Sequence, residues 1–198
     1  MTLQTPQPPP SALRAVLAAL NSEAALRQPG AAAALRSTAG QLQPAHPLAV
    51  HQLPPGTATA RALATAPRTG WRFLVKHGTA VVAAAEVAKS TEGHTFAHFA
   101  AGPYLDSTVR ALAEAWQLVQ PLKTVYRARL LSIPGHYSTA LWLHAVEADP
   151  AADLLLPLAP APLGITAHHA YPADELLARL ARRSARAVAV PLPGTAVA

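Results

Sequence analysis

TVYRARLLSIPGHYSTALWLHA, residues 124–145, is the stretch that decides the fold. Its two halves alternate apolar and polar side chains with the period of two that is typical of β-strands. Pro134-Gly135 between them suits the centre of a type II turn, so the stretch predicts a β-hairpin. If these two residues form the loop, Arg127 lies opposite Trp142. A longer loop is the alternative, because type II turns splay the strands of a hairpin.

The predicted hairpin has two unlike faces, since neighbouring residues of a strand point to opposite sides. The core-like face comprises Tyr126, Ala128, Leu130, Tyr137, Thr139, Leu141 and Leu143. The mixed face comprises Val125, Arg127, Arg129, Leu131, His136, Ser138, Trp142 and His144. We expect helices to cover the core-like face and the mixed face to stay open.

An earlier hairpin is predicted over residues 70–87, where WRFLV and AVVAAAEV flank a loop at His77-Gly78. With this loop, Trp71 lies on the more apolar face of the hairpin, which is the candidate core face. Arg72 and Lys76 lie on the opposite face. The full core face of that pairing is Trp71, Phe73, Val75, Ala80, Val82 and Ala84.

The remaining elements complete an α+β fold. Residues 89–103 form a connection, and residues 104–121 predict an amphipathic helix between the two hairpins. A short strand is expected at 154–158, and a last helix begins near Pro172. The predicted core is an antiparallel sheet of two β-hairpins with an intervening helix (ββαββ) and a C-terminal helix.

The N-terminal third differs in composition. Residues 1–69 contain none of the ten aromatic residues and ten of the 20 prolines, so they cannot easily build a core of their own. We expect a helical and loop segment there: a helix from Ser11 to before Pro29, another over 31–42, and mostly loop over 43–69 with a short helix near 59–66. The predicted organisation is therefore 1–69 as this segment, 70–190 as the α+β core and 191–198 as a disordered tail.

Composition bounds the class of protein. The chain has no cysteine, so disulfides and thiolate metal sites are excluded. Its start does not resemble a secretory signal and no apolar run is long enough to span a membrane, so a cytoplasmic protein without membrane contact is expected. The net charge is +6, which favours partners such as nucleic acid, although only 13% of residues are charged and a few arginines set this balance.

The mixed face of the late hairpin is the main candidate site. Arg127 and Arg129 alternate along one strand beside Trp142, and such a face can bind phosphates and stack bases. Arg72 and Lys76 could extend it. Two alternatives stay open: Arg127 lies over Trp142 and simply shields it as a cation–π pair, or the face is where two subunits meet.

A second candidate is the arginine stripe of the last helix, which could follow a phosphate backbone. Its members are Arg179, Arg182, Arg183 and Arg186. The alternative is a solvated face: Asp174 and Glu175 begin the helix and arginines end it, as the helix dipole favours.

Histidines provide the third candidate. His94 and His98 stand four residues apart, which on a helix would place both rings on one face as weak candidate metal ligands. No HExxH, GxSxG, P-loop or strand-linked GxGxxG motif accompanies them.

These observations favour a non-enzymatic nucleic-acid-binding protein, DNA before RNA, without a cofactor. Two alternatives remain: a protein–protein interaction or homodimerisation module, and a small histidine-dependent hydrolase or metalloenzyme.

Overall fold

A computed structural model describes residues 2–28, 35, 41–146 and 152–188 of the chain. The strands are β1 (Leu3–Gln4), β2 (Leu42–Gln52), β3 (Arg68–His77), β4 (Ala80–Ser90), β5 (Gly93–Ala100), β6 (Tyr126–Ile133), β7 (Ser138–Ala145), β8 (Leu154–Pro157) and β9 (Tyr171–Pro172). The α-helices in these ranges are α1 (Pro10–Leu20), α2 (Glu23–Leu26), α4 (Ala60–Ala64), α5 (Pro103–Val119) and α6 (Ala173–Val188).

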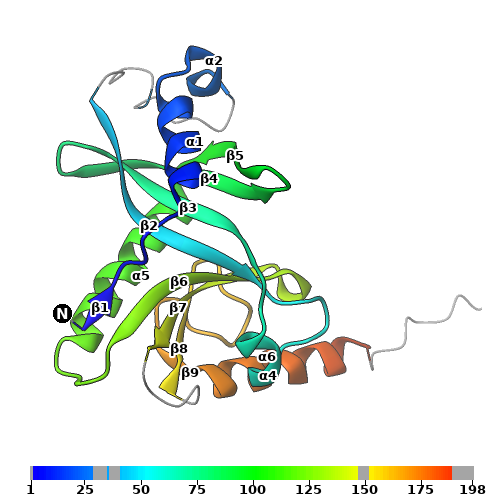
Figure 1. Ribbon diagram of the computed structural model, residues 1–198. Helices are drawn as coiled ribbons and strands as arrows, with labels where there is room; N and C mark the ends of the chain where they lie inside the picture. The colour runs from blue at the N-terminus through cyan, green and yellow to red at the C-terminus, as the bar shows by residue number, and fades with distance from the viewer. Residues whose placement is uncertain (1, 29–34, 36–40, 147–151, 189–198) are drawn as a thin grey trace, which may run out of the picture.

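All nine strands belong to one sheet in the order β5-β4-β3-β2-β6-β7-β8-β9, with β1 beside β6 (Figure 1). The sheet is antiparallel except where β6 pairs with β2 and with β1. The predicted mixed fold with a mostly antiparallel sheet is confirmed. The simple ββαββ arrangement is not, because β2 lies between the two predicted hairpins and β5, β8 and β9 extend the sheet.

The early hairpin, β3–β4, forms, but its loop is Gly78-Thr79 instead of His77-Gly78, with His77 opposite Ala80. An irregularity between Val75 and Lys76 shifts the register again. The predicted core face is therefore right for β3 and for Val82 of β4, but Ala84 lies on the other face and Ala80 is exposed. The residues that join Trp71, Phe73 and Val75 in the core are Ala83, Ala85 and Val87.

The late hairpin, β6–β7, has the longer loop that was left open. Residues 134–137 connect the strands through a 3-10 turn, and Arg129 faces Trp142 while Arg127 faces His144. The pairing is shifted by two residues from the one expected. Because two residues are a full period of a strand, the side chains of β6 and β7 keep their predicted faces. His136 and Tyr137 lie in the connection instead, and Tyr137, which was predicted for the core-like face, is 97% exposed.

Four strands were missed: the short strands β1 and β9 and the longer strands β2 and β5. Strand β5 lies inside the predicted connection 89–103, and β2 lies inside the predicted loop 43–69, with Leu42 at its start and not at a helix end. Prolines weaken the strand signal of β2, since proline cannot donate to a ladder. Pro44 stands opposite Val75 of β3, and Pro47 lies in an irregular step between Ala45 and Leu48, where His46 has φ of 43°. Most of the predicted helix 31–42 and all of the tail 191–198 lie outside the described residues.

The predicted helices at 59–66, 104–121 and after Pro172 are confirmed as α4, α5 and α6. The predicted N-terminal helix is shorter than expected. It ends at Leu20, and Ser22 begins the separate helix α2, whose Ala25 backbone N–H donates to the Ser22 hydroxyl over 3.4 Å.

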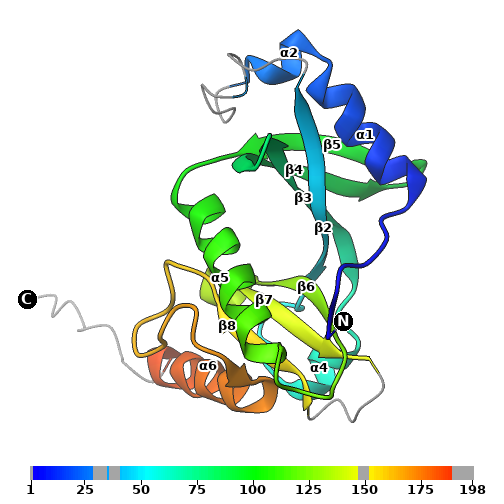
Figure 2. The same ribbon diagram turned by 90° about the vertical axis from the view of Figure 1, so that its left-hand side faces the viewer.

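Helices cover both faces of the sheet, so the expectation of one open face is wrong. One face packs on α5, where Leu105, Ala111 and Val119 are buried. The other face is covered twice: by α1 and α2 over β3–β5, and by α4 and α6 over β6–β8. Figures 1 and 2 show α1 at the upper end of the sheet and α6 beneath its lower end, with the chain between β1 and α1 crossing the sheet. The face between these two helical layers carries the candidate site.

No helix within the described ranges has the length and apolar character needed to cross a membrane.

Candidate functional site

One row of paired residues crosses the middle of the sheet on the doubly covered face. Trp71 of β3 pairs with Ala49 of β2, which pairs with Arg129 of β6, which pairs with Trp142 of β7. Ala49 is the one small residue of this row. Its methyl group leaves room between the indole of Trp71 and the guanidinium of Arg129, and the sheet is hollowed there.

The hollow is a cleft of about 490 Å³. We call it the arginine cleft, because three guanidinium groups line it. Its described lining residues are Gln4, Thr5, Pro6, Gln7, Ala49, His51, Arg68, Trp71, Arg127 and Arg129, and none of them is acidic. The segment Gln4–Gln7, which leaves β1 towards α1, forms one wall. Residues far apart in the sequence thus build a cationic cleft.

The three arginines have no ion-pair partner among the described residues. Arg127 and Arg129 are half-buried, whereas Arg68 is exposed. Burial lowers the pKa of Arg129 from its ordinary value and the positive charge of Arg127 lowers it further, while the negative charge of Asp153 opposes this. An arginine stays protonated in proteins, so the cleft holds three positive charges, of which Asp153 partly offsets that of Arg129.

Two tryptophans hold arginines in place by cation–π contact. The Arg68 guanidinium carbon lies 5.3 Å from the centroid of Trp71, and that of Arg129 lies 4.8 Å from the centroid of Trp142. The arginine over Trp142 is therefore Arg129, not Arg127. Such contacts contribute about 0.5–1 kcal/mol each at exposed sites and pre-orient the guanidinium groups.

Two buried side-chain nitrogens lack a hydrogen-bond partner in the described part of the chain. They are Trp71 Nε1, in a residue that is 2% exposed, and His94 Nε2. A buried donor without an acceptor costs about 1–3 kcal/mol. For Trp71, which lines the arginine cleft, an acceptor could come from a ligand.

Trp142 is 3% exposed, so the prediction that it stacks bases on an open face is wrong. Its indole N–H donates to Asp153 Oδ2 over 2.7 Å, and the backbone N–H of Ala145 donates to Asp153 Oδ1 over 2.8 Å. His144 Nδ1 lies 3.1 Å from Asp153 Oδ2. Sequence reasoning missed Asp153, which precedes the apolar run of β8 and carries no motif.

A second cavity of about 710 Å³ lies beside this network, between the sheet, α4 and the start of α6. Its lining residues are Ala60, Arg61, Leu63, Ala64, Arg129, Trp142, His144, Asp153, Ala173 and Asp174. Arg129 lines both this cavity and the arginine cleft. The walls are mostly apolar, with the His144–Asp153 pair as the polar end.

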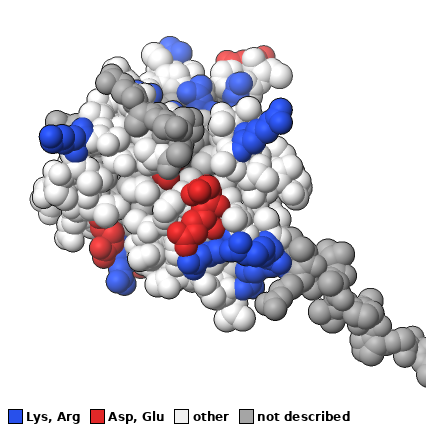
Figure 3. Space-filling view, turned by 90° about the horizontal axis from the view of Figure 1, so that it is seen from below, with Lys and Arg blue, Asp and Glu red and all other residues white. Residues whose placement is uncertain are grey.

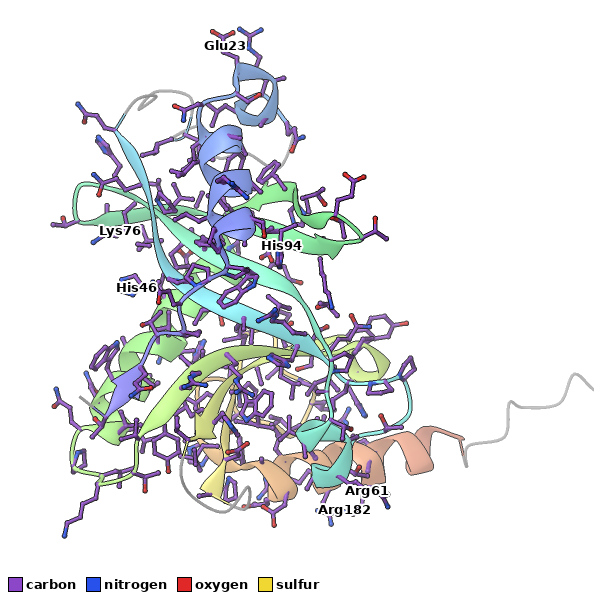
Figure 4. All side chains as sticks on the ribbon, viewed as in Figure 1. Glu23, His46, Arg61, Lys76, His94 and Arg182 are labelled. Carbon is purple, nitrogen blue, oxygen red and sulfur yellow. The ribbon has the colours of Figure 1, made fainter. Side chains whose placement is uncertain are left out.

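Arg72 and Lys76 do not join the arginine cleft. Arg72 forms an ion pair with Glu86 and donates to Thr108 Oγ1 of α5 over 3.1 Å, on the opposite face of the sheet. Lys76 lies near the tip of the β3–β4 hairpin, far from the lower end of the molecule (Figure 4).

The arginine stripe on α6 is also apart from the cleft. Arg179 pairs with Glu175, and Arg183 donates to the carbonyl of Leu163. Arg182 is exposed at the bottom of the molecule, where basic and acidic side chains lie side by side (Figures 3 and 4). The side chain of Arg186 lies outside the described residues. This arrangement agrees with a solvated face.

His94 and His98 lie on strand β5 and not on a helix. His94 Nδ1 is 2.8 Å from Ser11 Oγ of α1, while His98 is exposed. Within residues 2–28, 35, 41–146 and 152–188, no group of three histidine, aspartate or glutamate side chains could hold a metal ion.

His51 provides a pH-dependent contribution to stability. Burial lowers its pKa below 6.5, the Ala66 carbonyl at 2.9 Å from Nδ1 opposes this, and the charge of Arg129 adds to the lowering. Below about pH 6.5, His51 therefore becomes protonated in the unfolded chain but stays neutral in the folded chain. The free energy of unfolding consequently decreases as the pH falls below that value.

We expect the melting temperature to drop between pH 7.5 and pH 5.5, with a shallower drop in His51→Gln. Burial lowers the pKa of His94 and of His168 as well, so part of the slope should remain in the variant. Equal slopes for the two proteins would show that His51 does not contribute.

Comparison of the chain with known protein families, with curated proteins and with solved structures found no match.

Proposed function

We propose that this chain is a non-enzymatic nucleic-acid-binding protein, with DNA as the preferred ligand, and that it binds phosphates in the arginine cleft. One observation carries the proposal. Arg68, Arg127 and Arg129 meet in one concavity whose described lining holds no carboxylate, and none of them has an ion-pair partner in the described ranges.

The chemistry of the cleft suits a phosphate. Guanidinium groups bind phosphate oxygens with two parallel N–H donors, and these charge-assisted hydrogen bonds are about twice as strong as neutral ones. Partial burial strengthens them further, because the effective dielectric constant near a protein is lower than in water. Thr5 and the two glutamines of the N-terminal wall add neutral polar groups for a sugar.

The proposed contact set is narrower than the sequence predicted. We leave out Arg72, because Glu86 neutralises it, and Arg179, because it pairs with Glu175. Lys76, Arg182 and Arg183 lie apart from the cleft, and the side chain of Arg186 lies outside the described residues. Trp142 acts through Arg129, whose guanidinium it orients, and does not touch the ligand itself.

A gel-shift titration against salt tests the proposal. With about three phosphates neutralised, the logarithm of the association constant should fall with the logarithm of salt concentration at a slope of about −2 to −3. Absence of any shift at about 50 mM salt, or an affinity that salt does not change, would refute it.

A histidine-dependent hydrolase is the second candidate function, favoured by the His144–Asp153 pair at the 710 Å³ cavity. A buried carboxylate that accepts from Nδ1 leaves Nε2 of the neutral ring as a base that could activate water. If so, the protein should hydrolyse 4-nitrophenyl acetate with saturation kinetics, and His144→Gln should abolish this. A rate no greater in wild type than in the variant would exclude that role.

Homodimerisation stays a prediction. Trp142 is not its contact surface, because the chain itself buries that side chain. Light scattering of the purified protein measures the oligomeric state directly.

A further inference from the structure

We infer that the arginine cleft recognises the terminal phosphate of a single nucleic-acid strand in preference to the phosphodiesters within a chain. This inference rests on the proposed function and names the part of the nucleic acid that enters the cleft. Charge, shape and an unused donor support it independently.

The first argument is charge. A terminal phosphate monoester carries about −1.5 to −2 near neutral pH and presents three strong acceptor oxygens, whereas an internal phosphodiester carries one charge. Arg68, Arg127 and Arg129 bring three positive charges to one cleft whose described lining has no carboxylate, and only Arg129 is partly offset, by Asp153 of the neighbouring cavity. Three converging cations match a dianion better than a monoanion.

The second argument is shape. The cleft volume of about 490 Å³ lies within the range of small-ligand pockets, about 300–1,000 Å³. The segment Gln4–Gln7 closes one side, and the helical layers of α1–α2 and α4–α6 rise over the sheet at either end. Proteins that read a duplex groove insert a protruding helix or ribbon. Here Arg127 and Arg129 are half-buried at the cleft, so a narrow strand end can reach them more closely than the wide surface of a duplex can.

The third argument is the indole N–H of Trp71. This donor is buried without an acceptor, in a side chain that lines the cleft. Arg68, which is exposed, lies over the ring of the same tryptophan. A phosphate bound by the arginines therefore lies beside Trp71, and one of its oxygens could accept from the indole N–H. A terminal phosphate offers three free oxygens to these donors, whereas an internal diester offers two.

Fluorescence anisotropy with the full chain tests the inference. The probes are 12-nucleotide single-stranded DNAs of one sequence, labelled at the opposite end, with a 5′-phosphate, a 3′-phosphate or hydroxyls only. We expect at least one phosphorylated probe to bind about tenfold or more tighter than the hydroxyl probe. Inorganic phosphate and a mononucleotide serve as competitors, and we expect both to compete only at far higher concentration than the phosphorylated strand.

Trp71→Phe keeps the aromatic packing but removes the donor, so the preference for the phosphorylated probe should fall several-fold. Arg68→Gln, at an exposed position, should reduce the preference without disturbing the fold. Arg110→Ala is the control, because Arg110 lies on α5, across the sheet.

The outcomes separate the two proposals. Equal affinity for phosphorylated and hydroxyl probes would overturn the inference and leave nucleic-acid binding intact. Absence of binding to every probe would overturn both. Competition by the mononucleotide as strong as by the phosphorylated strand would also overturn the inference, since the cleft would then recognise free phosphate esters.

Discussion

Replacing Arg127 and Arg129 together by alanine should weaken DNA binding by about 100-fold or more, since each loss of about 1.4 kcal/mol is a factor of ten in affinity. Each arginine would lose charge-assisted hydrogen bonds to a phosphate, and hydrogen bonds to charged groups contribute about 1.5–3 kcal/mol. Both side chains are half-buried, so their hydrogen bonds to a phosphate should be stronger than those of fully exposed arginines. The salt slope should also become less negative by about 2, because two fewer phosphates are neutralised. Gel-shift or anisotropy titrations at several salt concentrations measure both quantities.

Arg110→Ala removes the same charge from the opposite side of the sheet, where that side chain is 68% exposed, and should change affinity little. Arg129→Lys keeps the positive charge but loses the planar guanidinium group, so its affinity for DNA should lie between those of the wild type and the double alanine variant. If the variant with both Arg127 and Arg129 replaced binds DNA as tightly as wild type, with an unchanged salt slope, the arginine cleft is not the DNA-binding site.

Asp153→Ala should be among the most destabilising single substitutions in the described chain. The carboxylate is 3% exposed and accepts from the indole of Trp142, the ring of His144 and the backbone N–H of Ala145. Its removal leaves buried donors without acceptors beneath α4 and α6. Breaking such a buried network costs about 3–5 kcal/mol. For a chain of this size we expect the melting temperature to fall by roughly 10 °C.

Asp153→Asn keeps the side-chain shape and one carbonyl oxygen, so its melting temperature should fall less than that of Asp153→Ala. Asp106→Ala in the first turn of α5 is a matched control outside this network. Thermal unfolding followed by circular dichroism gives all three melting temperatures. A shift of less than about 2 °C for Asp153→Ala would mean that these hydrogen bonds do not stabilise the fold.

The two hairpins could be predicted from the alternation of apolar and polar residues. A pairing that is wrong by two residues still assigns each side chain to the correct face of the strand. The late hairpin illustrates this: its loop was wrong, yet Arg129 and Trp142 share the predicted face. The β3–β4 hairpin shows the limit: the two-residue shift at its loop keeps the predicted faces, but the bulge next to Val75 moves β4 from Ala83 onward to the other side. Bulges leave no sequence signal that alternation alone can detect.

The arginine cleft could be predicted only in part. Arg127 and Arg129 were found because they alternate beside a tryptophan. Arg68 and Trp71 were not linked to them, because the connection runs through β2, whose prolines hide its strand character. Ala49 had no distinguishing feature in the sequence, although its small size opens the cleft. Such a site depends on strand order, which composition and periodicity do not determine.

The covering helices explain why the site is a cleft and not a flat platform. Helices α1 and α2 cover one end of this sheet face, and α4 and α6 cover the other end. The middle of the face has no helix over it, and the N-terminal segment Gln4–Gln7 forms one wall of the cleft there. The same arrangement buries Trp142, which converts the expected base-stacking platform into a support for Arg129.

Indole N–H resonances during titration with single-stranded DNA test the central claim most directly, since the chain has three tryptophans at distinct places. Trp71 lines the arginine cleft, and Trp116 lies on α5 across the sheet. The account predicts that the Trp71 signal shifts in proportion to bound DNA while the Trp116 signal stays in place. A shift of Trp116 with Trp71 unmoved, at saturating DNA, would contradict it.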